Sequence, residues 1–270
     1  REGLDGFLVP RADAFQGEYV APRDARLAWL TGFTGSAGFC AVLAGAAGVF
    51  VDGRYRTQVK AQVAADFTPV PWPEVSLADW LKDQLPTGGV VGFDPWLHTP
   101  AQMETLEEGL AGSGIEMRRS VNLVDRIWAD QPDAPAEKAV AHPLELAGES
   151  HDAKRARLAE ELRAAGQKAA LITLPDSHNW LLNIRGRDIP RNPVAHGFAV
   201  LHDDARVDLY MPAEKLDGLG EHLGGAVTVH APAALPACLE ALTGPVRVDR
   251  QSAPVALADI LGDKLAWGED

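Results

Sequence analysis

The sequence lacks features that would assign it to several common classes of protein. Its 270 residues include only Cys40 and Cys238, too few for a disulfide framework. No apolar run is long enough to cross a membrane, and the 38 acidic residues against 25 basic ones argue against a nucleic-acid-binding surface. The first residues do not form a signal peptide, so we expect a cytoplasmic protein. Both cysteines lie beside apolar residues, which predicts buried, reduced thiols; a single disulfide between domains is the alternative.

Common motifs of catalysis and metal binding are missing as well. No two of the eight histidines are spaced i, i+4, there is no HExxH or CxxC, and Ser36 lies in Thr-Gly-Ser-Ala-Gly rather than in a GxSxG elbow. The spacing of Gly32, Gly35 and Gly38 matches neither a dinucleotide-binding loop nor a P-loop, and an apolar run rather than a helix follows them. We expect these glycines to permit tight turns and close packing.

Two matching segments, which start at Gly6 and at Ala169, are the most informative feature that is present. Each begins with an apolar run, continues through a proline-containing turn into a Trp-Leu pair, and reaches a second apolar run that ends in Ala-Val-Leu. The Trp-Leu pairs are Trp29-Leu30 and Trp180-Leu181. A repeat of this length predicts two copies of one domain.

Apolar periodicity and turn residues predict alternating strands and helices in both copies. In the first copy we expect strands at 6–9, 38–43, 48–51, 67–70 and 90–93, and helices at 24–30, 55–63, 76–85 and 99–110. In the second we expect strands at 169–174, 198–201, 207–211, 227–230 and 246–248, helices at 152–165, 212–223, 235–242 and 255–261, and a helix that begins at Asp176 and contains Trp180. Asp176 and Gly186 are the predicted caps of the helix that contains Trp180, and residues 123–128 are expected to pack back on the first copy.

These elements predict an α/β fold of two tandem domains, each with a mixed sheet between helices in three layers. We place the first domain at residues 1–130 and the second at 149–270. Residues 131–148 form the predicted linker, because three prolines and no periodic apolar pattern occur in its first part, 131–143. The abrupt first strand and the lack of a clear stop after Leu265 predict that the chain is part of a longer protein.

Arg54 is the first candidate functional residue, in the run Asp52-Gly53-Arg54-Tyr55. The run joins a predicted strand to a predicted helix, where a cation opposes the helix dipole at a cost of up to about 1 kcal/mol. A carboxylate should compensate. It is either a local one, Asp52 or Asp24, or one that belongs to a ligand or a partner.

Arg185 is the second candidate, in Asn183-Ile184-Arg185-Gly186-Arg187. Near the end of the helix that contains Trp180, Arg185 and Arg187 would complement the negative end of the helix dipole. That local role is sufficient to explain them. A position at a domain interface or near a substrate is the alternative for Arg185.

Longer motifs give a specific resemblance. They are 17–22 (GEYVAP), 29–33 (WLTGF), 35–38 (GSAG), 52–55 (DGRY), 92–95 (GFDP), 122–128 (NLVDRIW) and 180–186 (WLLNIRG) with Asp188, Asn192, Pro193 and Val194. In this order they resemble the two N-terminal, creatinase-like domains of the Xaa-Pro aminopeptidase family, and the resemblance covers the whole chain.

The resemblance implies a cytosolic, dimeric metallopeptidase with a third domain. That catalytic domain holds two divalent metal ions, usually manganese, on two aspartates, a histidine and two glutamates, and cleaves peptides before a penultimate proline. None of those ligands lies in this sequence, so the chain is expected to be inactive alone, with no catalytic and no metal-binding residue. By the same resemblance, Arg54, Tyr55 and Arg185 are candidates for substrate-side or dimer contacts.

Two alternatives stay open at this point. The chain could be a non-enzymatic, protein-binding relative, such as the peptidase-like domain of histone chaperones. It could also belong to a related hydrolase of the prolidase or creatinase type, although those enzymes have one such N-terminal domain rather than two.

Overall fold

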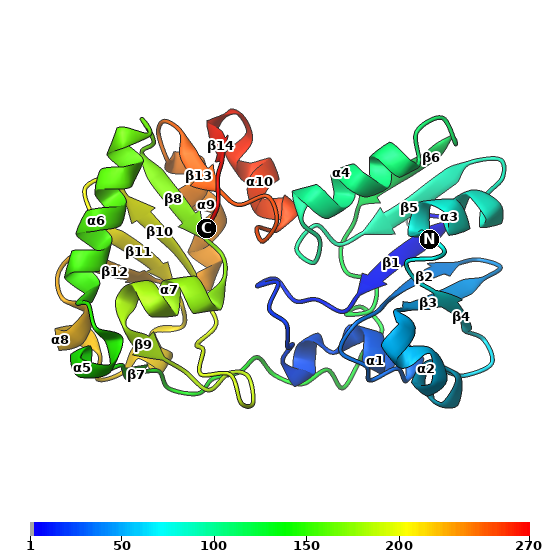
Figure 1. Cartoon of the computed structure of the whole chain (residues 1–270), viewed down its shortest axis with the longest axis horizontal. Coiled ribbons are helices and arrows are strands. Elements are labelled where there is room, and N and C mark those ends of the chain that lie inside the picture. The colour runs from blue at the N-terminus through cyan, green and yellow to red at the C-terminus, as the bar shows by residue number, and fades with distance from the viewer. Residues whose placement is uncertain (1–2) are drawn as a thin grey trace. The chain divides into compact units, whose positions relative to one another are not determined.

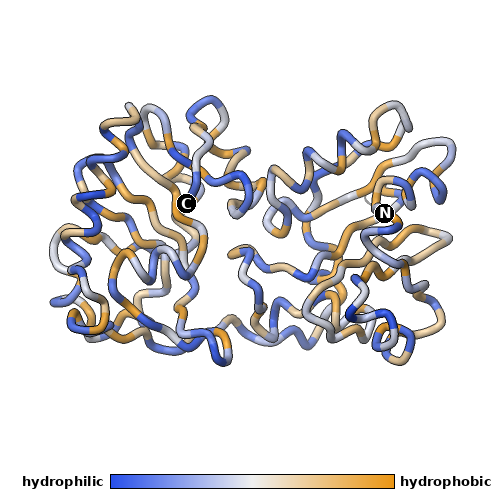
Figure 2. Tube along the Cα trace, in the orientation of Figure 1, coloured by the Kyte–Doolittle hydropathy of each residue, from blue (hydrophilic) through white to orange (hydrophobic). Residues whose placement is uncertain are grey.

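The chain divides into two compact units in the computed structural model, which describes residues 3–270 (Figure 1). The first contains the residues up to Ala14 together with Glu18–Asp133, and the second contains Phe15–Gly17 and Ala134–Asp270. The hydrophobic residues of each unit are concentrated along its strands (Figure 2). Each unit is described by itself below.

The first unit is built on a six-stranded mixed sheet in the order β4-β3-β2-β1-β5-β6. β1 pairs antiparallel with β2 and β2 antiparallel with β3, whereas the β3–β4, β1–β5 and β5–β6 pairs are parallel. The strands are β1 (Gly6–Pro10), β2 (Phe39–Leu43), β3 (Ala47–Val51), β4 (Thr68–Pro71), β5 (Gly89–Phe93) and β6 (Ile115–Arg119). β6 was not predicted, because its alternating Ile-Glu-Met-Arg-Arg run is short and largely exposed.

Helices cover both faces of this sheet (Figure 1). They are α1 (Arg26–Thr31), α2 (Arg56–Gln62), α3 (Leu77–Gln84) and α4 (Pro100–Gly109), with the 3-10 turns η1 (Pro22–Asp24) and η2 (Gly53–Tyr55). Val49 and Val51 share a core cluster with Leu27 of α1 and Val59 of α2. Successive side chains of a strand point to opposite faces, and Phe50 accordingly packs on Trp80 of α3.

Two helices of the first unit begin with a side-chain cap. Ser76 Oγ accepts the Asp79 N–H at 3.0 Å, and Thr99 forms a capping box with Gln102 at the start of α4. Residues 123–128 pack back on the unit, since Val124 and Trp128 belong to the same core cluster as Val59. The predicted helix 55–63 is shorter than expected, because Val63 has already turned to extended backbone.

The second unit has the same topology, with its sheet in the order β12-β11-β10-β8-β13-β14. Its antiparallel pairs are again the second and third of the sheet, β11–β10 and β10–β8, and the outer pairs are parallel. The strands are β8 (Ala169–Ile172), β10 (Phe198–His202), β11 (Val207–Tyr210), β12 (Val227–His230), β13 (Val246–Val248) and β14 (Leu265–Trp267). The repeated domain predicted from the sequence is therefore confirmed strand by strand, although β14 was not predicted.

Helices again cover both faces of the sheet, giving three layers. They are α5 (Leu144–Ala147), α6 (His151–Ala164), α7 (Pro175–Leu182), α8 (Gly220–Leu223), α9 (Leu235–Ala241) and α10 (Val255–Leu261), with the 3-10 turns η3 (Ala213–Leu216), η4 (Pro232–Ala234) and η5 (Gly262–Lys264). Leu162 of α6 and Leu181 of α7 pack with Leu209 of β11. On the opposite face of β11, the side chains of Tyr210 and Cys238 of α9 are hydrogen-bonded.

Several expectations for this unit were wrong in detail. The helix predicted at 212–223 is divided into η3 and α8, because Gly218 has a φ of 85°. Asp176 is not the cap of α7, since Leu174 occupies that position and Pro175 begins the helix. The linker is partly regular: β7 (Val140–Ala141) pairs antiparallel with β9 (Ile184–Arg185). Both cysteines are free, but only Cys40 is buried; Cys238 is half-buried.

Candidate functional site

Arg54 is held by its neighbour Asp52 in the turn after β3. Asp52 Oδ1 accepts the Arg54 backbone N–H at 2.9 Å, and Asp52 Oδ2 accepts from Arg54 Nη2 at 2.6 Å. This hydrogen bonding lowers the pKa of the Asp52 carboxyl and raises the pKa of the Arg54 guanidinium. The local carboxylate expected at this position is therefore Asp52, whereas Asp24 pairs with Arg26. The Arg54 side chain remains 68 % exposed and accessible to a ligand.

Tyr55 is fixed beside Arg54 by a hydroxyl and by an aromatic contact. Its hydroxyl lies 2.6 Å from Ser36 Oγ, and its ring meets Phe33 edge-on at 5.7 Å between centroids. The hydrogen bond to Ser36 lowers the pKa of the Tyr55 phenol. A Cβ on Gly35 would lie 2.2 Å from Phe33 Cζ and 2.8 Å from Tyr55 Cδ1, so this glycine has the close-packing role that the sequence predicted.

The expectation that Gly186 caps the helix before Arg185 is wrong. Helix α7 ends at Leu182, and Asn183 is its cap with a left-handed φ of 48°. The Asn183 side chain holds this conformation, since its Oδ1 accepts from Lys154 Nζ at 2.8 Å. Asparagine tolerates the left-handed region better than most residues, so the glycine expected there is not required.

Gly186 and Arg185 instead belong to extended backbone after α7. Arg185 lies in β9 opposite Val140 of β7, and its Nη1 donates to the carbonyl of Ile184 at 3.1 Å. A Cβ on Gly186 would lie 2.4 Å from the backbone nitrogen of Ala195. Gly186 is therefore needed for the close approach of two chain segments rather than for a helix cap.

A buried polar cluster lies under the segment that follows Gly186. The side chains of Asp188 and Lys215 form an ion pair with exposed fractions of 0 % and 2 %, and Asp188 Oδ2 also accepts the His196 backbone N–H at 2.5 Å. Burial lowers the pKa of His196 to about 4 and that of His178 to about 3, so both imidazoles are neutral at pH 7. Asp188 was noted in the sequence only as part of a motif; its partner Lys215 was missed, because nothing local connects the two residues.

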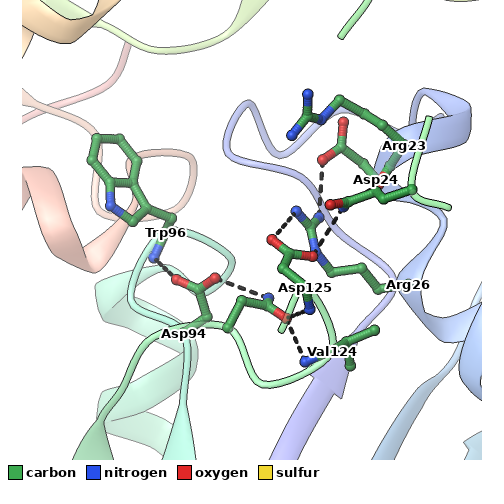
Figure 3. Close-up of polar contacts among 9 residues, drawn as sticks. Arg23, Asp24, Arg26, Asp94, Trp96, Val124 and Asp125 are labelled. Carbon is green, nitrogen blue, oxygen red and sulfur yellow. Dashed lines mark hydrogen bonds and ion pairs between the residues drawn. The ribbon is translucent and has the colours of Figure 1, made fainter. Parts of the chain in front are cut away.

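A second polar network ties together three loops of the first unit (Figure 3). Arg26 donates from Nε and Nη2 to the two oxygens of Asp125 at 2.6 and 2.9 Å, and from Nη1 to Asp24 at 2.9 Å. Asn122 Nδ2 donates to Asp94 Oδ2 at 2.9 Å. Each of these carboxylates is bonded to a donor, so the network is suited to holding the loops in place rather than to proton transfer.

The sequence contained a signal for part of this network. Asp94 follows β5, and Asn122 lies three residues after β6, its parallel neighbour. The carboxyl ends of parallel strands meet at one edge of a sheet, so recognition of β6 would have placed these two side chains together.

The described residues do not gather the donors that a metal ion needs. Within 3–270, no group of three or more His, Cys, Asp or Glu side chains is placed to hold one. On the second sheet, Asp208 is bonded to two histidines, accepting from His202 Nε2 at 2.7 Å and from His230 Nε2 at 2.8 Å. No helix of this part of the chain is both long and apolar enough to span a bilayer.

Comparison with known proteins places both units in one family. Residues 1–127 and residues 130–269 each match a family model described as the creatinase/prolidase N-terminal domain. The chain belongs to this family. The two tandem domains of this type that the sequence predicted are thereby confirmed.

Relatives of this chain include proteins more than twice its length. It is 34 % identical to the probable Xaa-Pro aminopeptidase P of Talaromyces stipitatus across 99 % of the chain and 41 % of that protein. It is 39 % identical to the Talaromyces marneffei protein of the same name across 85 % of the chain and 36 % of that protein. The chain thus spans about two fifths of the length of these relatives.

A solved structure agrees with this assignment. The X-prolyl aminopeptidase of Caenorhabditis elegans, described as a cytosolic enzyme with a di-nuclear active site, matches 98 % of the chain and 45 % of its own length. The TM-score is 0.91 and the sequence identity is 29 %. The chain therefore has the fold of the N-terminal region of an X-prolyl aminopeptidase.

Proposed function

We propose that the whole protein is a metal-dependent Xaa-Pro aminopeptidase, of which this chain is the non-catalytic N-terminal region. The enzyme would remove the N-terminal residue of peptides that carry proline at the second position. The observation that carries the proposal is the match of 98 % of the chain to less than half of the C. elegans enzyme. Two divalent ions, with manganese as our expectation, would be bound by a part of the protein outside residues 3–270. Residues 3–270 themselves contain no suitable group of ligands.

In this proposal the two domains serve dimerisation and substrate access. The support is the exposure of Arg54 on a rigid turn: Asp52 fixes its backbone, and the Tyr55 ring, whose centroid lies 5.3 Å from Arg54 Cζ, supports its guanidinium. A cation held in this way is available to a carboxylate of a peptide or of a second copy. Arg185 is the corresponding candidate in the second unit. The cytosolic description of the C. elegans relative supports the same location for this protein.

The test of the proposed function uses the whole protein and this chain side by side. We expect the whole protein with Mn²⁺ to release the first residue of an Xaa-Pro-Pro peptide, and this chain to release none under the same conditions. A dipeptide Xaa-Pro and creatine serve as substrates that report prolidase and creatinase activity. Hydrolysis of either one in preference to Xaa-Pro-Pro, or metal-dependent release by this chain alone, would contradict the proposal.

Arg54 is tested in the whole protein by Arg54→Gln, with Arg206→Gln as the matched control. Arg206 has the same local geometry, since it donates through its backbone N–H and its Nε to Asp204, two residues earlier, at 3.1 and 2.7 Å. We expect Arg54→Gln to raise KM or to weaken the dimer in analytical ultracentrifugation, and Arg206→Gln to change neither. Equal behaviour of the two variants would remove Arg54 from the proposed contact surface.

A further inference from the structure

A short hairpin in the second unit, residues 185–195, carries three arginines, Arg185, Arg187 and Arg191. Its two arms are joined by backbone hydrogen bonds from Gly186 to Pro193 and from Asp188 to Val194, both at 3.1 Å. Arg185 and Arg187 are two residues apart on the first arm, and the Asp188 side chain that follows them is buried. Arg191 lies at the tip, where it is exposed like Arg187, whereas Arg185 is half-buried.

The tip has the arrangement of a type II turn with an unusual residue at its third position. The Asn192 N–H donates to the Ile189 carbonyl at 3.1 Å, Pro190 occupies the second position, and Arg191 has a φ of 68°. Glycine is favoured there, because a side chain in the left-handed region is strained. A long cation at a strained position of an exposed tip is better explained by what the cation binds than by the fold.

The hairpin is fixed from beneath. Asp188 is buried and bonded to Lys215 and to the His196 N–H. At the end of the second arm, Asn179 accepts the Ala195 N–H at 3.1 Å and donates to the Ala195 carbonyl at 2.9 Å. The arginines therefore project from a preorganised support, which reduces the entropy that a ligand must offset on binding.

Comparison of the two units shows that the fold does not require this hairpin. In the first unit, residues 32–38 join α1 to β2. In the second unit, residues 183–197 make the equivalent connection from α7 to β10, and the hairpin accounts for the extra length. Additional loops on a shared scaffold are a common location of binding sites.

Within the described residues of the second unit, the three guanidinium groups form no ion pair. None of the ion pairs of this unit involves Arg185, Arg187 or Arg191, although the chain carries a net charge of −13. Three other arginines of this unit form ion pairs, Arg155 with Asp152, Arg157 with Glu149 and Arg206 with Asp204. Unpaired arginines on an acidic protein form a local site for anions, and the planar guanidinium suits a carboxylate.

We propose that the hairpin 185–195 is a docking site for the carboxylates of a peptide ligand. Arg187 and Arg191 make the direct contacts, and Arg185 adds charge at the base of the first arm. The inference deepens the proposed role in substrate access and rests on it only for the choice of a peptide as ligand. A carboxylate from acidic side chains and one from a free C-terminus have the same chemistry here, and the test separates these two sources.

The test measures binding of fluorescent hexapeptides to this chain by anisotropy at low salt. A Glu-rich peptide with an amidated C-terminus carries only side-chain carboxylates, a Gln-rich peptide with a free C-terminus carries only the terminal one, and the amidated Gln-rich peptide is the blank. We expect at least one carboxylate peptide to bind more tightly than the blank. The triple variant Arg185→Gln, Arg187→Gln, Arg191→Gln should weaken that binding about tenfold, since it removes up to three charge pairs at or near the surface.

Two further variants separate binding from folding. Arg191→Gly removes the strained side chain, so it should weaken binding severalfold without lowering the midpoint of thermal unfolding. Arg157→Gln removes an exposed, paired arginine and should leave binding unchanged. The proposal is overturned if no carboxylate peptide exceeds the blank or if the triple variant binds as well as the natural chain. This binding test measures no catalysis, so its outcome does not depend on whether the whole protein hydrolyses Xaa-Pro-Pro peptides.

Discussion

Removal of the Lys215 charge should strongly destabilise the second unit. In Lys215→Met, a side chain of similar length leaves Asp188 buried with an exposed fraction of 0 % and without its counter-ion. Breaking one side of a buried ion pair costs about 3–5 kcal/mol, because the remaining charge stays desolvated. With a urea m-value of about 2 kcal/mol/M, the unfolding midpoint of this unit should fall by about 1.5–2.5 M.

The assay is urea unfolding of the whole chain, followed by far-UV circular dichroism and by hydrogen exchange of the β10 amides, Phe198–His202, which report on the second unit. The matched control is Lys138→Met. Lys138 pairs with Asp217 at 2.5 Å, but its side chain and that of Asp217 are 63 % and 68 % exposed. Water replaces the lost partner there, so the midpoint should scarcely change.

The double variant Asp188→Asn, Lys215→Met makes the reasoning refutable in a second way. If the cost arises from the unpaired charge, neutralising Asp188 should restore part of the stability lost in Lys215→Met. The reasoning is refuted if Lys215→Met unfolds at the same urea concentration as the control, or if the double variant loses the sum of the two single effects.

Three further predictions concern buried groups. Burial lowers the pKa of His178 to about 3 and that of His196 to about 4, from 6.5, so only the unfolded state takes up these protons as the pH falls through 6.5. The stability of the second unit should therefore be complete above pH 6.5 and decline toward pH 4. His178→Gln should flatten this pH dependence of the urea midpoint. Burial raises the pKa of Cys40 to about 12, so Ellman's reagent at pH 8 should modify Cys238 first and Cys40 only on unfolding; rapid modification of both would contradict the burial. Arg26→Lys cannot keep both bonds to Asp125 and should lower the stability of the first unit by about 1–3 kcal/mol in thermal unfolding, whereas Arg54→Lys on the exposed turn should leave it unchanged.

Elements whose signals are local could be predicted from the sequence. β1 and β8 are apolar runs, and the caps Ser76 and Thr99 act on backbone N–H groups within three residues. The edge strands β6 and β14 were missed, because β6 is short and largely exposed and β14 has only three residues, too few to show a period. Their strand conformation depends on pairing with β5 and β13, which a local pattern does not contain.

The same distinction applies to the candidate site residues. Arg54 could be matched to a carboxylate because Asp52 is two residues away. The ion pair of Arg26 with Asp125 joins residues 99 positions apart, and that of Asp188 with Lys215 joins residues 27 apart. Such pairs are set by the topology of the sheets, so only the structure could bring them together.

The symmetry of the two units also indicates which polar residues serve the fold. After β5, Asp94 Oδ1 accepts the Trp96 N–H at 2.9 Å, and after the equivalent strand β13, Asp249 Oδ1 accepts the Gln251 N–H at 2.8 Å. An aspartate that makes the same turn in both copies is explained by the turn. The arginine hairpin has no counterpart between α1 and β2, and no local hydrogen-bonding need explains Arg191 at a positive φ. Departures of one copy from the other are therefore the positions at which ligand binding should be sought first.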